Sequence, residues 1–200
     1  MEYLLAMLQI NLHNLPKLSE ILEDCRRLNI PILQPDVNHS QLNFTVEILP
    51  TGQQAIRCGL AMVKHVGPDQ ANRIIEARDN KPFIDLTDLL NRLDWNKINR
   101  QSLENLIKVG SFHKFGERYD LLCSIDLVRK KCKAIWKNKA KAVSQMTLFS
   151  VSDMMETIKL SDYIDPNCTE TEPTERELLE WERELLGFYV TARPTDRHRA

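Results

Sequence analysis

The sequence lacks several features that would assign a function class directly. No apolar run approaches the roughly 20 residues that span a membrane, and the first residues show no signal-peptide pattern. The five cysteines form no C-x-x-C pair and do not stand at zinc-ligand spacing with the five histidines. No two aspartates are separated by one residue, so the two-metal pattern of nucleotidyl transfer is absent. These absences predict a cytoplasmic protein with reduced, mostly packed thiols and no membrane association.

The charge is distributed unevenly along the chain. Residues 1–56 hold 3 basic and 6 acidic residues, residues 57–141 hold 18 and 10, and residues 142–200 hold 6 and 12. The net charge of −1 therefore conceals a central segment of +8 between acidic flanks of −3 and −6. Such a pattern predicts a polyanionic partner for the middle of the chain.

The stretch from Gly59 to Arg78 has the pattern of a helix-hairpin-helix. Leu60 and Val63 predict a first helical limb, Val66 and Gly67 a turn, and Pro68 the start of a second helix. The unpaired N–H groups of such a helix start, next to a glycine, can bind a phosphate without reading base sequence. The alternative is an ordinary helical corner within a core.

The flanking segments predict a mainly α fold. Residues 42–48 alternate apolar and polar residues and 55–58 can return as a partner strand, which predicts a small β-hairpin before the helical hairpin. Asp85 and Asn99 are placed to cap two further helices, and Thr174 with Glu177 forms a capping box for a last one.

A second glycine turn and a basic helix follow. The stretch GSFHKFGERYDLL, residues 110–122, again sets glycines around a turn before a helix, so it predicts a second, divergent hairpin. The helix continuing from Glu117 carries seven lysines and arginines between Arg129 and Lys141 with no acidic residue among them. This run predicts contact with a DNA backbone; the alternative is a solvated charged face.

A short peptide, Q-x-x-L-F at residues 145–149, stands where helical periodicity ends. Leu148 and Phe149 are adjacent large apolar residues in a polar loop, which favours a peptide that fills a partner's pocket. The alternative is that both side chains pack into their own domain.

Taken in order, six segments resemble the bacterial replicative DNA polymerase III alpha subunit of the C family. They are LEDCRRLNIPILQPDVNHS, IRCGLAMVKHVGPDQANRIIEAR, PFIDLTDLLNRLD, SLENLIKVGSFHKFGERYDLL, SQMTLF and ERELLGFYVTARPTD. The sequence departs from that family at Gln34, where a proline is common, at His65, where a hairpin glycine is usual, and at Ala192-Arg193-Pro194, where Gly-His-Pro is usual.

The resemblance implies four segments. Residues 1–57 are expected to be the end of a fingers region that includes the β-hairpin, and 58–125 a tandem helix-hairpin-helix domain. Residues 126–170 are expected to hold the basic helix and a sliding-clamp motif, and 171–200 a linker helix toward an OB domain that this chain does not contain. The expected clamp-binding residues are Gln145, Leu148 and Phe149. The expected DNA contacts are Lys64, His65, Val66, Gly67, Asp69, Gln70, Arg73, Lys108, Gly110, Lys114, Gly116, Arg118, Arg129, Lys130, Lys133 and Lys137.

The function implied is non-catalytic within this chain: binding of primer-template duplex DNA through its phosphates, and tethering of a polymerase to the sliding clamp. Other replisome subunits are expected as partners of the full-length polymerase. No cofactor or catalytic residue is expected here, because the family's Mg²⁺ ions belong to the palm domain. Two alternatives remain: the DNA-binding part of a nuclease or repair enzyme, and a structural scaffold. A nuclease needs clustered carboxylates, whereas Asp85, Asp88 and Asp94 fit a helix cap and a surface better.

Overall fold

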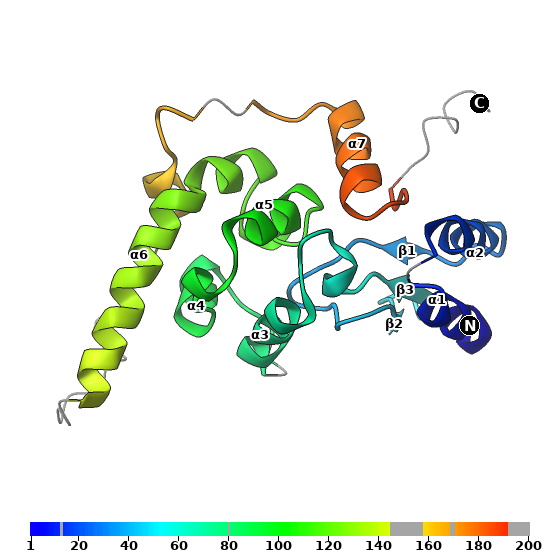
Figure 1. The fold of residues 1–200 in the computed structure, drawn as a ribbon, viewed down its shortest axis with the longest axis horizontal. Helices are drawn as coiled ribbons and strands as arrows, with labels where there is room; N and C mark the ends of the chain where they lie inside the picture. The colour runs from blue at the N-terminus through cyan, green and yellow to red at the C-terminus, as the bar shows by residue number, and fades with distance from the viewer. Residues whose placement is uncertain (13, 80, 145–157, 169–170, 192–200) are drawn as a thin grey trace.

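The fold is mainly helical, as the sequence predicts (Figure 1). The computed structural model describes residues 1–12, 14–79, 81–144, 158–168 and 171–191. The α-helices are Glu2–Ile10 (α1), Leu15–Arg27 (α2), Pro68–Arg78 (α3), Leu86–Arg92 (α4), Arg100–Lys108 (α5), Arg118–Ser144 (α6) and Glu175–Leu185 (α7). The strands are Ile32–Leu33 (β1), Thr45–Ile48 (β2) and Gln54–Arg57 (β3). Short 3-10 turns are Leu60–Met62 (η1), Trp95–Lys97 (η2), His113–Phe115 (η3) and Leu160–Tyr163 (η5).

The predicted β-hairpin is present as part of a three-stranded sheet. β2 and β3 pair antiparallel, and β1 adds to the other edge of β3 in parallel register. The added strand β1 lies between Pro31 and Pro35. The carbonyl of Pro31 accepts the N–H of Ile56 at 2.8 Å. The end of the hairpin faces solvent, because the side chain of Ile48 is 70% exposed.

The first limb of the expected helix-hairpin-helix is shorter than predicted. The residues from Leu60 form only the 3-10 turn η1, whereas α3 begins at Pro68 as expected, with Gly67 as its N-cap. A Cβ at Gly59 would collide with the backbone of Leu42 and Asn43, so the chain enters this limb in close contact with the segment before β2.

The other predicted helix starts are confirmed. The Asp85 carboxylate accepts the N–H of Asp88 at 2.8 Å, and the Asn99 side chain accepts the N–H of Gln101 at 3.0 Å. The capping box of α7 is formed in both directions by Thr174 with its partner three residues on. Side-chain caps of this kind satisfy N–H groups that a helix leaves unpaired at its start.

One hydrophobic core joins the N-terminal, central and C-terminal segments. Its largest fully buried side chains include Trp95, Phe44, Phe83 and Phe112. Phe44 before β2 also lies beside Phe188 after α7, with ring centroids 6.1 Å apart. A fully buried side chain of this size contributes about 2–3 kcal/mol. The division at residues 57, 125 and 170 stays a prediction, since a shared core does not locate such boundaries.

The expectation that all thiols are reduced is wrong for two of them. Cys123 of α6 and Cys168 form a disulfide with their Cα atoms 5.4 Å apart. Because residues 158–168 run back along α6, the carbonyl of Cys123 also accepts the N–H of Asp165 at 3.1 Å. The pairing spans 45 residues without a local motif, so spacing alone could not reveal it. A disulfide is uncommon in reducing compartments, and the cytoplasmic location stays a prediction.

The other three cysteines, Cys25, Cys58 and Cys132, are buried free thiols, as expected. Burial raises the pKa of Cys25 and Cys58, and it raises the pKa of Cys132 to about 11. Such thiols are poor nucleophiles because the thiolate is the reactive form. Among the described residues, no helix is both long and apolar enough to cross a membrane.

Candidate nucleic-acid interface

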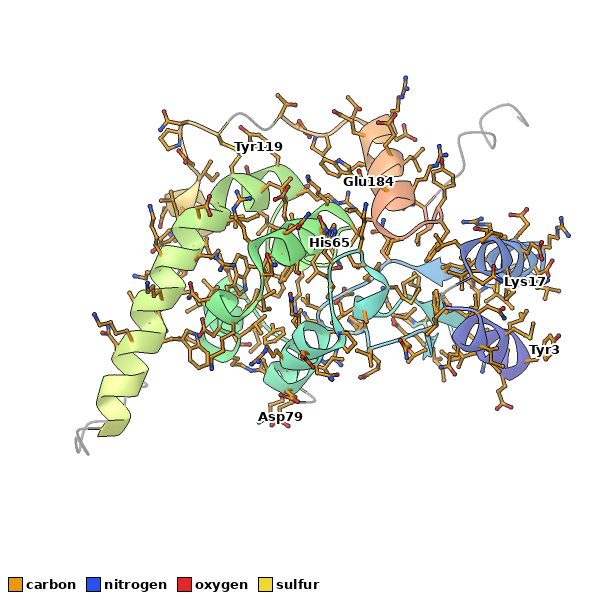
Figure 2. The ribbon with its side chains drawn as sticks, viewed as in Figure 1. Tyr3, Lys17, His65, Asp79, Tyr119 and Glu184 are labelled. Atoms are coloured by element: carbon orange, nitrogen blue, oxygen red, sulfur yellow. A yellow bond between two sulfur atoms is a disulfide. The ribbon has the colours of Figure 1, made fainter. Side chains whose placement is uncertain are left out.

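The first turn, residues 63–67, lies on the surface between η1 and α3. Val63 and Val66 anchor it to the core, with exposed fractions of 2% and 4%. Lys64 and His65 between them are exposed, and His65 adopts a left-handed backbone with φ 67°. Figure 2 labels His65 in the middle of the molecule, in front of α5 and between α3 and α7. The alternation of buried valines and exposed polar residues therefore projects the turn outward.

Helix α5 holds the first turn from behind. The hydroxyl of Ser102 donates a hydrogen bond to the carbonyl of His65 at 2.6 Å. The side-chain amide of Asn105 donates to the carbonyl of Lys64 at 2.7 Å. Both α5 side chains are buried, with exposed fractions of 0% and 5%. Two carbonyls of the turn are thus satisfied internally, which fixes the direction in which its N–H groups point.

Helix α7 contacts the first turn from the side. The N–H of Lys64 donates to the carbonyl of Leu185 at 2.8 Å, and its ammonium lies 3.7 Å from the Glu184 carboxylate. The position of α7 is itself fixed by the buried Glu182, which accepts hydrogen bonds from Gln34 at 2.8 Å and from the N–H of Val190 at 2.7 Å. The backbone N–H of Lys64 is therefore not available to a phosphate, and the open N–H groups must lie elsewhere on the turn.

Three N–H groups remain open at the start of α3. Within the part of the chain that the structure describes, the amides of His65, Gly67 and Asp69 have no hydrogen-bond partner, whereas Val66 donates to the carbonyl of Val63 at 2.9 Å. Gly67 has φ −73°, and a Cβ added there would meet nothing within 4 Å. Open amides at a helix N-terminus, where the helix dipole is positive, suit an anion.

The start of α5 lies beside the start of α3. The N–H of Asn99 donates to the Gln70 side chain at 3.4 Å, so Gln70 links the two helices. Arg73, one turn further along α3, is exposed and has no ion-pair partner among the described residues. The structure therefore brings together the first turn, the open end of α3 and one free cation.

At the second turn, residues 110–116, side chains pack closely over both glycines. Gly110 is buried with φ +83°, and a Cβ there would collide with the guanidinium of Arg118. Gly116 has φ +154°, and a Cβ there would collide with Leu160. Each glycine thus permits close packing of a side chain, and phosphate binding at Gly110 and Gly116 stays a prediction. The glycine spacing in the sequence does not distinguish a glycine that exposes its backbone from one that permits close packing of a side chain.

Three cations predicted at the second turn make internal contacts. Arg118 is half-buried; burial lowers the pKa of its guanidinium, and the carboxylates of Glu182 and Glu117 oppose that shift. Lys108 lies 2.8 Å from the Glu104 carboxylate and above the ring of Trp181. Lys114 is exposed, and its ammonium donates to the carbonyl of Phe83 at 3.0 Å. Lys108 and Lys114 are thus engaged within the chain, whereas Nε of Arg118 is buried without a hydrogen-bond partner among the described residues; the role of all three as phosphate ligands stays a prediction.

The basic helix is confirmed as the second half of α6. Arg129 donates to the carbonyl of Ile98 at 2.8 Å, so it packs against the loop before α5. Lys130, Lys133 and Lys137 are exposed, without an ion-pair partner among the described residues, and their spacing places them on one stripe of the helix. We call these three residues the lysine stripe. The predicted clamp residues, Gln145, Leu148 and Phe149, lie outside the described residues.

The carboxylates weighed for a nuclease site have structural roles. Asp85 caps α4, Asp94 accepts the N–H of Asn96 at 3.0 Å, and Asp88 lies 3.1 Å from the Arg92 guanidinium. The residues that sequence reasoning missed are Ser102 and Asn105, which hold the first turn. Their only signal is that two polar residues three apart interrupt an otherwise apolar face of α5.

Comparison with known proteins agrees with this architecture. Residues 29–121 match the family described as "Helix-hairpin-helix motif", and the first turn lies within the matched residues.

Over nearly its whole length the chain is similar to the protein named DNA polymerase III subunit alpha. It is 30% identical to that of Campylobacter jejuni over 200 residues, 98% of this chain and 16% of that protein. The corresponding values are 33%, 98% and 15% for Thermus aquaticus, and 34%, 96% and 16% for Mycobacterium tuberculosis H37Rv. The predicted resemblance to this subunit is confirmed, and the chain spans about 15% of the length of these relatives.

Proposed function

We propose that this chain binds duplex DNA through its phosphate backbone, as part of a replicative polymerase. The observation that carries the proposal is the group of three open amides, from His65, Gly67 and Asp69, at the exposed start of α3. Amides bind a phosphate oxygen but do not distinguish one base from another, so contact through them is independent of sequence. The similarity to a polymerase subunit and the helix-hairpin-helix match support DNA as the source of that phosphate.

Cations beyond the first turn add electrostatic attraction. Among the described residues, neither Arg73 on α3 nor the three cations of the lysine stripe on α6 has an ion-pair partner. Backbone-only contacts of this kind give dissociation constants of roughly 10⁻⁴ to 10⁻⁶ M near physiological salt. The affinity is expected to fall steeply with salt, because each phosphate that is neutralised releases bound counterions.

Fluorescence anisotropy with unrelated duplexes at several salt concentrations tests the proposal. We expect similar affinity for every sequence and a linear fall of log affinity with log salt. A variant with Lys130, Lys133 and Lys137 all changed to Ala lowers that slope by about 1 for each lysine that contacts a phosphate. A control variant, Lys17→Ala with Arg27→Ala on α2, leaves the slope unchanged. Affinity that ignores salt, or no affinity at all, contradicts DNA binding and favours a scaffold.

We further propose that residues 145–149 dock on the sliding clamp, and that other replisome subunits contact the full-length polymerase. The clamp proposal rests on the Q-x-x-L-F sequence and on the resemblance of the chain to a polymerase subunit. In this scheme Leu148 and Phe149 fill an apolar pocket of the clamp while the Gln145 amide hydrogen-bonds at its rim. Anchors of this type dominate small interfaces.

Calorimetry against the sliding clamp of the same bacterium tests the docking. Changing Leu148 and Phe149 to Ala is expected to weaken clamp affinity about 30-fold to 1000-fold while duplex binding survives. The Gly67→Val variant is the matched control, since it is expected to lose duplex affinity and keep clamp affinity. Unchanged clamp affinity together with a lower melting temperature shows instead that both side chains belong to the core.

A further inference from the structure

His65 combines an unfavourable backbone with a tightly held side chain. Among the described residues, the other non-glycine residues with positive φ are Asn29 and Asp79, whose short polar side chains tolerate this conformation. His65 adopts φ 67° on the exposed first turn, and histidine tolerates this conformation better than most non-glycine residues. Left-handed backbone at a residue of this type persists where the surroundings impose it. The surroundings here are the hydrogen bonds from Ser102 and Asn105 to the turn.

The contact with Asn105 fixes which nitrogen of the imidazole carries the proton. The amide nitrogen of Asn105 lies 2.7 Å from the carbonyl of Lys64, so this atom must be the NH₂ group rather than the oxygen. The same nitrogen lies 3.2 Å from Nδ1 of His65. An amide NH₂ donates and does not accept, so Nδ1 must accept and be unprotonated. The neutral ring then carries its proton on Nε2.

The protonated nitrogen faces away from α5. The two ring nitrogens of imidazole point to roughly opposite sides, so Nε2 lies on the side of the ring that is turned away from Asn105. The side chain is exposed, and Nε2 has no partner among the described residues. It therefore presents an N–H donor on the same turn as the open amides of His65 and Gly67. A donor in a fixed tautomer matches a phosphate oxygen, which only accepts.

We propose that His65 is a phosphate ligand of the first turn, donating from Nε2, and that Asn105 is the residue that positions its ring. This inference rests on the proposed DNA binding and adds a side-chain contact to it. The contact does not require a charged imidazole, because the neutral ring already offers the donor.

The tautomer is tested without DNA. Long-range ¹⁵N–¹H correlation spectra of the full chain, recorded where the histidines are neutral, are expected to show His65 protonated on Nε2 and bare on Nδ1. An Asn105→Ala variant is expected to lose that preference for one tautomer if it remains folded. A parent spectrum with the proton on Nδ1 overturns the inference whatever the DNA affinity is.

The contact is tested by duplex affinity. His65→Gly removes the ring and suits the left-handed backbone, so this variant is expected to fold at least as well as the parent. Its affinity for a duplex is expected to fall about 10-fold to 150-fold, the loss of one hydrogen bond to a charged group. The control is His113→Ala, which removes an exposed histidine from the second turn and is expected to leave affinity unchanged.

The possible outcomes separate the two proposals. A parent that binds duplex DNA and a His65→Gly variant that binds equally well contradict the role of His65 alone. A parent that binds no duplex contradicts the proposed function and the inference together. Equal losses in His65→Gly and His113→Ala show a general effect of histidine removal and also contradict the inference.

Discussion

At Gly67 a helix starts with an unobstructed backbone, whereas at Gly110 the backbone lies beneath an arginine. Both glycines stand in turns that precede a helix, and the sequence predicts a phosphate site at each. The first turn leaves three amides open and its glycine has empty space above it. The second turn uses positive φ and close contact with Arg118 to pack the start of α6.

The difference between the two turns comes from side chains that are distant from them in sequence. The side chain over Gly116 is Leu160, and the segment that carries it is tied to α6 by the disulfide from Cys123 to Cys168. Among the described residues no disulfide ties a segment over the first turn, which α7 contacts through Lys64. A glycine in a helix-initiating turn therefore marks either an exposed backbone or a tight packing position, and the tertiary contacts decide which.

The largest expected effect concerns the disulfide that ties residues 158–168 to α6 over the second turn. Cys168→Ser removes a cross-link that closes 45 residues, which corresponds to about 4 kcal/mol in the chain-entropy model. Urea unfolding without reductant is expected to show this loss in the variant. With reductant present, parent and variant are expected to agree closely. If parent and variant have the same stability without reductant as well, the disulfide is not formed in solution.

The matched pair Gly110→Ala and Gly67→Ala tests the two turns directly. At Gly110 the methyl group meets Arg118 and the backbone has φ +83°, so we expect a loss of about 3 kcal/mol. At Gly67 the backbone suits alanine and the space is open, so the loss is expected to stay below about 1 kcal/mol. Thermal melting compares the two, and a larger shift for Gly67→Ala reverses the assignment.

DNA affinity is expected to depend on Gly67 more than on Lys64. Gly67→Val places a branched side chain beside the open amides and is expected to weaken duplex binding about 10-fold. Lys64→Ala is expected to weaken it less than about 3-fold, because this exposed ammonium already lies near Glu184 and is screened by salt. Anisotropy titrations measure both, after circular dichroism confirms folding. An intact Gly67→Val variant that binds like the parent rules out this phosphate site.

The smallest expected effect comes from Asp69. This residue offers an open amide to a phosphate while its own carboxylate, exposed in the first turn of α3, repels the same anion. Asp69→Asn is expected to tighten duplex binding about 2-fold, and the gain is expected to shrink as salt rises. Anisotropy at low and high salt checks both statements. Weaker binding by the variant at low salt is the contrary result.

Local signals predicted much of the fold. Pro68, Asp85, Asn99 and the Thr174 capping box start helices where expected, because caps depend on a few adjacent residues. Strand β1 was not predicted, because it is only two residues long and pairs with β3, which is distant in sequence. Leu28 continues the apolar spacing of α2 in the sequence but is 62% exposed, since α2 ends at Arg27.

The sequence predicts only those parts of the candidate site that depend on adjacent residues. Gly67 and Pro68 mark the start of α3 in the sequence itself. The roles of Ser102 and Asn105 arise from packing between α5 and a turn 37 to 41 residues earlier, and no short-range pattern reports that contact. The close packing at Gly110 and Gly116 depends likewise on side chains from other elements.

The most direct measurement is an amide ¹⁵N–¹H titration of the labelled full chain with an unrelated-sequence duplex. If phosphate binds at the open end of α3, the amides of His65, Gly67 and Asp69 shift most, and those of Gly110 and Gly116 shift little. The same pattern is expected for duplexes of different sequence. Largest shifts at the second turn, or shifts confined to α1 and α2, would contradict phosphate binding at the first turn.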